Sequence, residues 1–193
     1  TFRNYRKELD LYRYSKLILY CPTFRDVYAL KPFSDNFMTK LNEYLLKNNY
    51  ILLIKRHSYD FTLQVKGYSN ILDISDKILD VQDILPDIDI LITDYSSIIF
   101  DFILLNRPVI LYPYDLYDYI NKCRELYYDY YKDLIGPFAS NEEELFSILT
   151  NIEEIFNNKQ YKMKYEEFKD RFHYYKDGKA CERLYNILIK NIK

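Results

Sequence analysis

The sequence predicts an α/β fold, in which helices flank a parallel β-sheet and further helices form a C-terminal tail. Strand-like and helix-like segments alternate along most of the 193 residues, which is the pattern of a parallel sheet with crossover helices. The clearest unit is residues 89–102, DILITDYSSIIFDF, where a β-favouring apolar run meets a polar turn and then an apolar helical pattern. Because 49% of the residues are hydrophobic, the chain can bury a sizeable core.

Five short apolar segments predict the strands of this sheet. They are residues 16–21, 50–55, 70–74, 90–92 and 108–112. The first segment is stopped by Pro22, which has no N–H to donate to a neighbouring strand.

Helices are predicted between and after these strands. Ser34 is the expected N-cap of a helix to about Lys47, and Asn141 is the expected N-cap of another, with three glutamates in its first turn. The other predicted helices are residues 97–105, a tyrosine-rich helix over 116–131, residues 160–172 and 179–192, with one or two helical turns at 80–86. Residues 1–15 are interpreted as a lead-in from a preceding segment, so the predicted domain is 16–193.

Composition argues against several classes of function. The net charge of −2 gives no electrostatic footprint for nucleic acid. Three cysteines without metal-ligand spacing predict neither a disulfide framework nor a zinc site, and favour a reducing compartment. With three glycines in all, neither a Walker loop nor a G-x-G-x-x-G fingerprint is present. No apolar run approaches the roughly 18 residues of a membrane span, and no signal peptide is evident.

Polar side chains collect at the carboxyl ends of the predicted strands. They are Thr23, Arg25, His57, Asp94, Ser96, Ser97 and Asp115. These ends lie on one edge of a parallel sheet, where open α/β sheets bind ligands, so we expect the side chains to converge.

Ser96 and Ser97 predict a phosphate site within that group. They stand at the start of a predicted helix, whose unpaired N–H groups and positive dipole end favour an anion. The alternative is that either serine merely caps the helix, which serine does often.

Three arginines are candidate phosphate partners, because a guanidinium group can clamp a phosphate with two hydrogen bonds. They are Arg25, Arg107 and Arg124, and the alternative for each is an ordinary surface arginine. Asp101 lies four residues after Ser97 on the same helical face, where it can bind a ligand hydroxyl or pair with a neighbouring base.

The two histidines differ in their surroundings. His57 directly follows a predicted strand, and is either structural or a hydrogen-bond donor or acid to a leaving phosphate. His173 lies on a polar late helix and is not expected to be catalytic. The many tyrosines between residues 112 and 131 are expected to pack, with one or two able to stack on a base.

Four segments carry a family resemblance. They are residues 19–26 (LYCPTFRD), 53–57 (LIKRH), 88–108 and 175–180 (YKDGKA), and the string DILITDYSS followed by FDF is the most specific. On these segments the chain resembles the CDP-glycerol:poly(glycerophosphate) glycerophosphotransferases, which polymerise teichoic acids and related capsule polymers. The resemblance runs in order from about residue 16 to residue 190.

This resemblance implies a GT-B-type enzyme of two Rossmann-like domains, of which this chain is the C-terminal, donor-binding half. The N-terminal acceptor domain, with the family's proposed base, is not found in the sequence. The implied reaction is attack on the β-phosphate of CDP-glycerol by a terminal hydroxyl of the growing polymer, with release of CMP. No obligatory metal is implied, so protein donors must neutralise the phosphates.

The resemblance also implies the roles of site residues. His57 is expected to contact the donor phosphates and to be needed for activity, and Ser96 and Ser97 to bind donor phosphate at the helix N-terminus. Together with the residue chemistry described above, the expected donor-phosphate and nucleotide residues are Thr23, Arg25, Asp94, Ser96, Ser97 and Arg124, and Asp101 is expected to bind the polyol. The expected location is the inner face of the cytoplasmic membrane, with membrane contact made by the rest of the protein.

Two departures from the family pattern leave the donor open. Ser58 follows the histidine where proline is usual, and Arg124-Glu125-Leu126-Tyr127 lacks the glycine of an Arg-Gly-Phe-Tyr-like segment. The donor is therefore CDP-glycerol, CDP-ribitol or another CDP-polyol. The alternatives are a GT-B sugar transferase that uses a nucleotide sugar, or a noncatalytic scaffold domain; retention of His57 with both serines argues against the scaffold.

Overall fold

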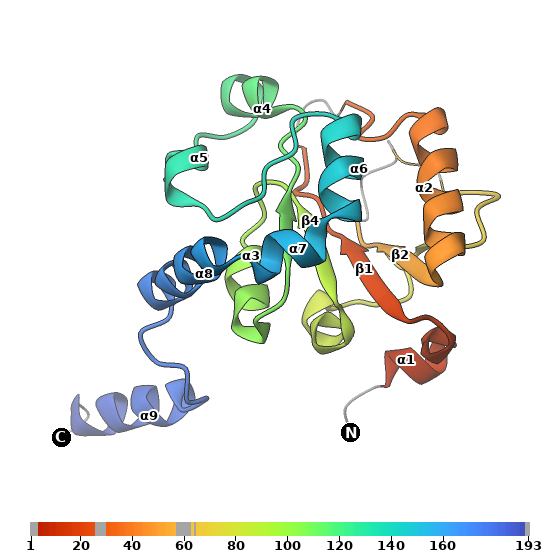
Figure 1. The fold of residues 1–193 in the computed structure, drawn as a ribbon. Helices are drawn as coiled ribbons and strands as arrows, with labels where there is room; N and C mark the ends of the chain where they lie inside the picture. Colours follow the sequence, from red (N-terminus) through yellow and green to blue (C-terminus); the bar gives the residue numbers. More distant parts are fainter. Residues whose placement is uncertain (1–3, 26–29, 57–62, 64, 192–193) are drawn as a thin grey trace.

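A computed structural model describes residues 4–25, 30–56, 63, 65–191 of the chain (Figure 1). Its centre is a five-stranded parallel sheet in the order β3-β2-β1-β4-β5. The strands are β1 (Lys16–Tyr20), β2 (Tyr50–Ile54), β3 (Ile71–Asp73), β4 (Ile90–Thr93) and β5 (Val109–Leu111). Every predicted strand is therefore present, and the predicted α/β class is confirmed.

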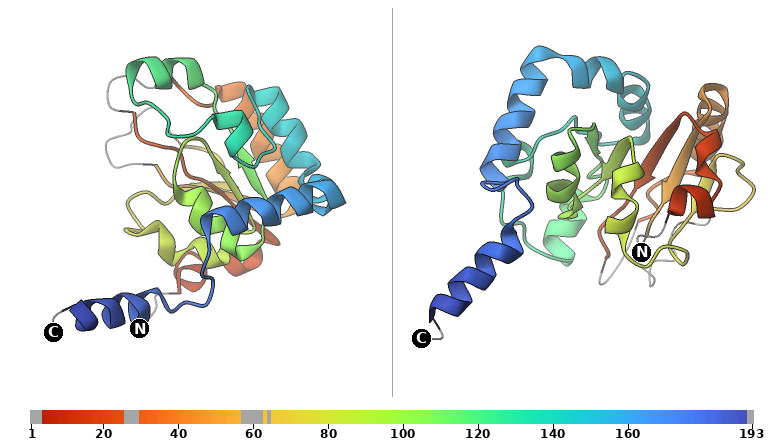
Figure 2. Two further views of the ribbon diagram at one scale, coloured as in Figure 1. Left: turned by 90° about the vertical axis from the view of Figure 1, so that its left-hand side faces the viewer. Right: turned by 90° about the horizontal axis from the view of Figure 1, so that it is seen from below.

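Helices cover both faces of the sheet (Figures 1 and 2). Because successive side chains of a strand point to opposite faces, Leu17 and Leu19 belong to one buried cluster while Ile18 and Tyr20 belong to the other. The first cluster is covered by α3 (Ile98–Phe102) and α8 (Lys159–Phe172), and the second by α2 (Asp35–Asn48) and α6 (Glu142–Thr150). The sheet is thus buried on both sides, as its nearly continuous apolar strands require.

The predicted N-caps are confirmed. The Ser34 hydroxyl accepts a hydrogen bond from the Phe37 N–H at the start of α2, and the Asn141 side chain accepts one from the Glu144 N–H at the start of α6. Each supplies a partner for a helix N–H that has none within the helix.

The predicted helix over residues 116–131 is wrong in its middle. The structure has two short helices, α4 (Leu116–Lys122) and α5 (Tyr130–Asp133), separated by seven irregular residues. The reason is a new start signal, because the Asp129 carboxylate accepts from the Lys132 N–H and caps α5. Sequence analysis also missed α7 (Ile152–Asn157).

The N-terminal residues pack onto the sheet. Residues 5–13 form α1 (Tyr5–Glu8) and a 3₁₀ turn at Leu11–Arg13, and Tyr5 and Leu11 are buried in the first cluster. Two further 3₁₀ turns, Val81–Asp83 and Leu85–Asp87, occupy the segment where one or two helical turns were predicted.

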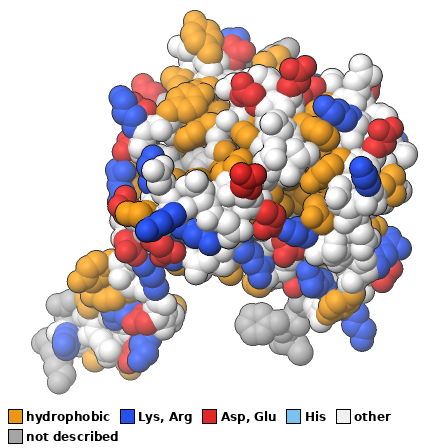
Figure 3. Space-filling view, viewed as in Figure 1, with side chains coloured by type: hydrophobic (Ala, Val, Ile, Leu, Met, Phe, Trp, Pro, Cys, Tyr) orange, Lys and Arg blue, Asp and Glu red, His pale blue; other side chains and the backbone are white. Residues whose placement is uncertain are grey.

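The last helix, α9 (Ala180–Asn191), stands away from the rest of the molecule (Figures 1 and 2). Hydrophobic side chains are visible on it in Figure 3, and Leu184, Ile187 and Leu188 are each more than half exposed. Within the described part of the chain, no helix combines the length and apolarity needed to cross a bilayer.

Candidate functional site

A cavity of about 450 Å³ lies beside the turn between β4 and α3; we call it the β4 cavity. Residues from three separate parts of the chain line it: Thr23 in the loop after β1, residues between 94 and 100 at the turn after β4 and the start of α3, and residues between 119 and 134 from α4 to just past α5. Five of the predicted site residues are among its lining: Thr23, Asp94, Ser96, Ser97 and Arg124. The predicted convergence at the carboxyl edge of the sheet is present for Thr23, Asp94, Ser96 and Ser97.

Asp94 joins the loop after β1 to the turn after β4. Its Oδ1 accepts hydrogen bonds from the Thr23 N–H at 2.8 Å, the Thr23 hydroxyl at 2.7 Å and the Tyr95 N–H at 2.6 Å. Since the Thr23 hydroxyl donates to Asp94, it ties the loop after β1 to the end of β4. A contact of Thr23 with a phosphate stays a prediction.

Arg25 lies behind the cavity wall and pairs with two carboxylates. Its Nε and Nη2 donate to the two oxygens of Asp115 at 2.8 and 2.7 Å, and Nη2 lies 2.8 Å from Asp94 Oδ2. The three side chains are at most 3% exposed. This cluster joins the ends of β1, β4 and β5, and it occupies the guanidinium group that sequence analysis assigned to a phosphate.

Tyrosine rings enclose the Arg25 guanidinium. The rings of Tyr95 and Tyr119 stack on each other at 4.1 Å between centroids, and Arg25 Cζ lies 5.0 Å from each. The Tyr95 hydroxyl donates to Asp115 at 3.0 Å, and the Tyr130 hydroxyl donates to the Asp94 carbonyl at 2.7 Å. Aromatic faces and hydroxyl donors thus shield the charged cluster from water.

The charges of this cluster interact strongly. Burial raises the pKa of Asp94, an effect that the Arg25 charge and the Thr23 hydrogen bonds oppose. Burial alone would lower the pKa of Arg25, but the hydrogen bonds of Asp115 and the charge of Asp94 outweigh it and raise that pKa. Arg25 is therefore charged at any physiological pH.

Ser96 and Ser97 present hydroxyl groups at the cavity. Ser97 is the N-cap residue of α3 and is exposed, but its side chain makes no capping hydrogen bond. The Ser96 hydroxyl accepts from the Ile98 N–H at 3.4 Å, which is a long contact. Capping therefore does not occupy the Ser97 hydroxyl, and phosphate binding by the pair stays a prediction.

Asp101, another predicted site residue, does not line the β4 cavity. Asp101 is exposed, and its carboxylate accepts a hydrogen bond from the Gln82 side chain at 2.8 Å, where sequence analysis expected a base or a ligand. His57 lies outside the residues that the structure describes.

Two further residues that were considered as candidates from the sequence contact backbone carbonyl groups in the structure. The Arg107 guanidinium donates to the carbonyls of Pro86 and Ile88, and His173 Nε2 lies 2.6 Å from the Phe100 carbonyl oxygen.

The sequence predicted that one or two tyrosines could stack on a base, but not which tyrosines line the site. Tyr95, Tyr119, Tyr128 and Tyr130 line the β4 cavity, together with Leu126. The density of tyrosine between residues 112 and 131 was the available signal, but which rings face the cavity depends on the break between α4 and α5. Among the described residues, no three His, Cys, Asp or Glu side chains gather in a way that would hold a metal ion.

Comparison with known proteins adds a family. A family model described as CDP-Glycerol:Poly(glycerophosphate) glycerophosphotransferase matches residues 1–190. The chain is 35% identical over 191 residues to the teichoic acid glycerol-phosphate transferase of Staphylococcus aureus, covering 91% of this chain and 45% of that protein. It is 34% identical over 183 residues to the teichoic acid poly(ribitol-phosphate) polymerase of Bacillus spizizenii, covering 90% of this chain and 28% of that protein. The chain therefore spans less than half of the length of these two relatives.

Solved structures support the same relationship. The wall teichoic acid polymerase TagF superposes with a TM-score of 0.76 at 33% identity, over 97% of this chain and 46% of that chain. A Staphylococcus aureus MnaA–UDP co-structure superposes with a TM-score of 0.53 at 17% identity, over 95% of this chain and 48% of that chain, and shows a shared fold alone. The expected Rossmann-like, GT-B-type sheet with a helical C-terminal end is confirmed by these likenesses and by the strand order.

Proposed function

The chain belongs to the CDP-glycerol:poly(glycerophosphate) glycerophosphotransferase family, and from this premise we propose that it is the donor-binding domain of a CDP-polyol phosphotransferase. In the proposed reaction, a terminal hydroxyl of a growing cell-surface polymer attacks the β-phosphorus of CDP-glycerol or a related CDP-polyol. A new phosphorus–oxygen bond forms to the acceptor, the bond from that phosphorus to the bridging oxygen breaks, and CMP leaves. The curated relatives include both a glycerol-phosphate transferase and a ribitol-phosphate polymerase, so both polyols are candidates.

The observation that carries this proposal is the convergence of predicted phosphate residues on the β4 cavity. Ser96 and Ser97 offer hydroxyl groups at the turn after β4, and Arg124 approaches from the stretch between α4 and α5. Donors aimed at phosphate oxygens stabilise the charge that develops as CMP leaves. We assign this role to these three residues, without a bound metal.

Arg25 and Asp94 are proposed to position the site and not to contact the donor. Their ion pair fixes the loop after β1 against the end of β4, and so sets the position of the turn that carries the serines. His57 comes three residues after the end of β2 in the sequence and is proposed to protonate the leaving phosphate. Asp101 is proposed to bind polyol hydroxyls, in exchange for its hydrogen bond with Gln82.

A second domain is needed to complete the reaction. The relatives are more than twice as long as the matched region, which leaves room for an acceptor-binding domain that precedes this one. We propose that this domain binds the reacting end of the acceptor polymer and supplies the base, and that the whole protein works at the inner face of the cytoplasmic membrane. Any membrane contact would be made by that remaining part.

The donor class is tested by titration calorimetry of this chain with CDP-glycerol, CDP-ribitol, CMP and a UDP-sugar. We expect a CDP-polyol to bind more tightly than the UDP-sugar. A Ser96→Ala, Ser97→Ala double variant should weaken that binding by at least about tenfold, because each lost hydrogen bond to a charged group is worth about 1.5–3 kcal/mol.

Ser69→Ala, at an exposed serine that does not line the β4 cavity, is the matched control and should bind like the unchanged chain. Preference for the UDP-sugar would support a GT-B sugar transferase instead. If the double variant bound the CDP-polyol as tightly as the unchanged chain, the proposal that this turn binds the donor phosphates would be wrong.

A further inference from the structure

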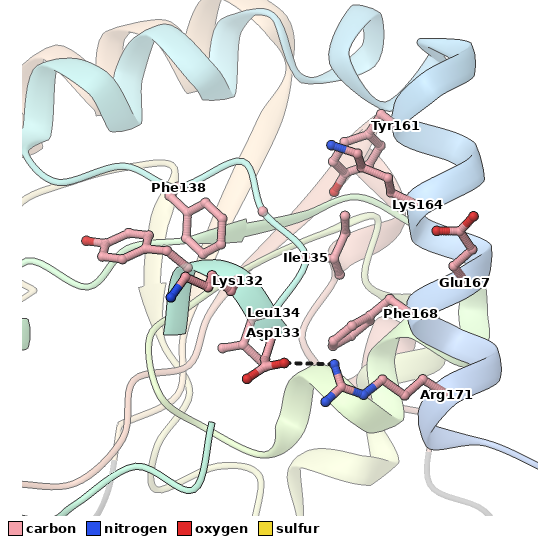
Figure 4. Close-up of a pocket in the computed structure, with 12 residues that line it drawn as sticks. Lys132, Asp133, Leu134, Ile135, Phe138, Tyr161, Lys164, Glu167, Phe168 and Arg171 are labelled. Carbon is pink, nitrogen blue, oxygen red and sulfur yellow. Dashed lines mark hydrogen bonds and ion pairs between the residues drawn. The ribbon is translucent and has the colours of Figure 1, made fainter. Parts of the chain in front are cut away.

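A second cavity, of about 480 Å³, is lined by three residues of α5, whereas Tyr130 of the same helix lines the β4 cavity; the lining of the second cavity is drawn in Figure 4. Residues 131–138 form one wall and α8 forms the other, so we call it the α5–α8 cavity. Leu134 lines both cavities. In addition, Arg171 lines the α5–α8 cavity while its Cζ lies 5.9 Å from the ring centre of Tyr128, which lines the β4 cavity. The two cavities are therefore neighbours, and residues of α5 line both of them.

Helix α8 presents a mixed aromatic and cationic stripe to this cavity. Tyr161, Lys164, Phe168 and Arg171 are spaced by three, four and three residues, which places them on one face of a helix. Figure 4 shows all four directed toward the segment that carries Leu134, Ile135 and Phe138. The floor is apolar, and the rim carries the charges.

The rim has an excess of positive charge. Lys132, Lys164 and Arg171 stand against two carboxylates, Asp133 and Glu167. Arg171 pairs with Asp133 at 3.0 Å (Figure 4). Lys132 pairs with Asp129, outside the cavity, at 2.8 Å. Across the described part of the chain, Lys164 has no hydrogen-bond or ion-pair partner.

A buried hydroxyl at the same end of the cavity also lacks a partner. Tyr161 packs its ring against Phe156 and Tyr165, and its hydroxyl is buried with no hydrogen bond to any described residue. Leaving such a group unpaired costs about 1–3 kcal/mol. Because burial raises the pKa of Tyr161, its hydroxyl remains a donor at neutral pH.

We propose that the α5–α8 cavity binds a phosphodiester of the polyol-phosphate chain, with Lys164 and Tyr161 as donors to its oxygens. This inference rests on the proposed function, since it assigns a site to the polymer and not to the donor. A phosphodiester of this kind carries one negative charge, which suits the rim, and a short carbon skeleton, which suits the floor at Ile135, Phe138 and Phe168. The adjacent β4 cavity lies within reach of the same chain, so the polymer is held beside the site where its terminal hydroxyl reacts.

Titration calorimetry with a synthetic glycerol-phosphate oligomer tests this site. Lys164→Gln is expected to weaken oligomer binding about tenfold, because a charged hydrogen bond is lost. The matched control is Lys162→Gln, on the same helix, because Lys162 does not line the cavity and its ammonium bonds to Asn157. That control should bind the oligomer like the unchanged chain.

Tyr161→Phe separates a binding role from a structural one. Removing a hydroxyl that has no partner should leave the melting temperature unchanged or raise it, while oligomer binding weakens several-fold. Inorganic phosphate and CMP serve as competitors, and neither should displace the oligomer at equal concentration.

The outcomes separate this inference from the proposed function. Oligomer binding that is insensitive to both Lys164→Gln and Tyr161→Phe, or equally sensitive to Lys162→Gln, would overturn the inference. If the unchanged chain binds CDP-glycerol but no oligomer, the inference fails and the proposed donor function stands. If the unchanged chain binds the oligomer through Lys164 but binds no CDP-polyol, the inference about the α5–α8 cavity is supported and the proposed donor function is wrong.

Discussion

At the scale of single residues, the candidate site depends on a buried group of three charges. Arg25 is held by Asp115 through two hydrogen bonds and by Asp94 through an ion pair, and all three side chains are almost fully buried. A buried pair of this kind adds little net stability, but breaking it leaves an uncompensated charge. The role of the cluster is therefore to hold together the three loops that follow β1, β4 and β5 beside the β4 cavity.

Replacing Asp115 by Asn tests that role. The shape is kept, but Arg25 keeps only Asp94 as a charged partner and loses the charge-assisted hydrogen bonds to Asp115, so we expect the free energy of unfolding to fall by about 3 kcal/mol and CDP-polyol affinity to fall with it. Chemical denaturation and calorimetry measure the two effects.

The matched control is Asp118→Asn, which breaks a partly exposed ion pair with Lys122 on the helix that Asp115 precedes. It should change stability by less than about 1 kcal/mol. Equal losses of unfolding free energy in the two variants would contradict a structural role for the pairing of Asp115 with Arg25.

The same residues show what a sequence can and cannot predict about a site. The positions of Thr23, Asp94 and Ser96 follow from one rule, that polar residues after parallel strands meet at one edge of the sheet. The partner of Arg25 does not follow from it, because Asp115 lies 90 residues away and the pairing depends on how two loops cross. Arg25 was therefore assigned to a phosphate on the strength of its chemistry alone.

At the scale of elements, local signals place the ends of helices well. Ser34 and Asn141 were predicted as caps because their side chains can accept from the helix N–H groups, and both do so. The two caps also lie close in space, since Glu142 accepts hydrogen bonds from the N–H and the hydroxyl of Ser34. Helices α2 and α6 are thereby joined at their N-termini.

Asn141→Ala is expected to lower the free energy of unfolding by about 1 kcal/mol, because the Glu144 N–H loses its partner. For a chain of this size, the melting temperature should fall by about 2–4 °C. Scanning calorimetry measures the change.

Asn151→Ala provides the comparison, since Asn151 is the N-cap residue of α7 but its side chain accepts no hydrogen bond from an α7 N–H and donates instead to the Ser147 carbonyl of α6. A loss from Asn141→Ala that is no larger than that from Asn151→Ala would contradict the capping account.

The break between α4 and α5 was not predictable from apolar periodicity. Residues 116–131 are rich in tyrosine, which can pack on a helix or on a cavity wall, so the pattern did not distinguish the two. Asp129 supplies the start signal for α5, but aspartate is also common within helices at exposed positions. The stretch between the two helices forms part of the β4 cavity, so the missed break and the missed aromatic lining have one cause.

At the scale of the whole molecule, residues of α5 line two neighbouring cavities, and one of them is at the carboxyl edge of the sheet. The β4 cavity carries the hydroxyls proposed to hold the donor phosphates, and the α5–α8 cavity carries the cations proposed to hold the polymer. Together with family membership, this arrangement supports the proposed transfer of polyol phosphate from a CDP-polyol in the β4 cavity to a polymer held in the α5–α8 cavity.

The most direct test of the central claim is a crystal structure of this chain with CDP-glycerol bound. We predict that the β-phosphate lies in the β4 cavity, with at least one of its oxygens within about 3.2 Å of the Ser96 or Ser97 hydroxyl or N–H. A donor whose phosphates lie away from this turn, whether in the α5–α8 cavity or elsewhere on the sheet edge, would contradict the account.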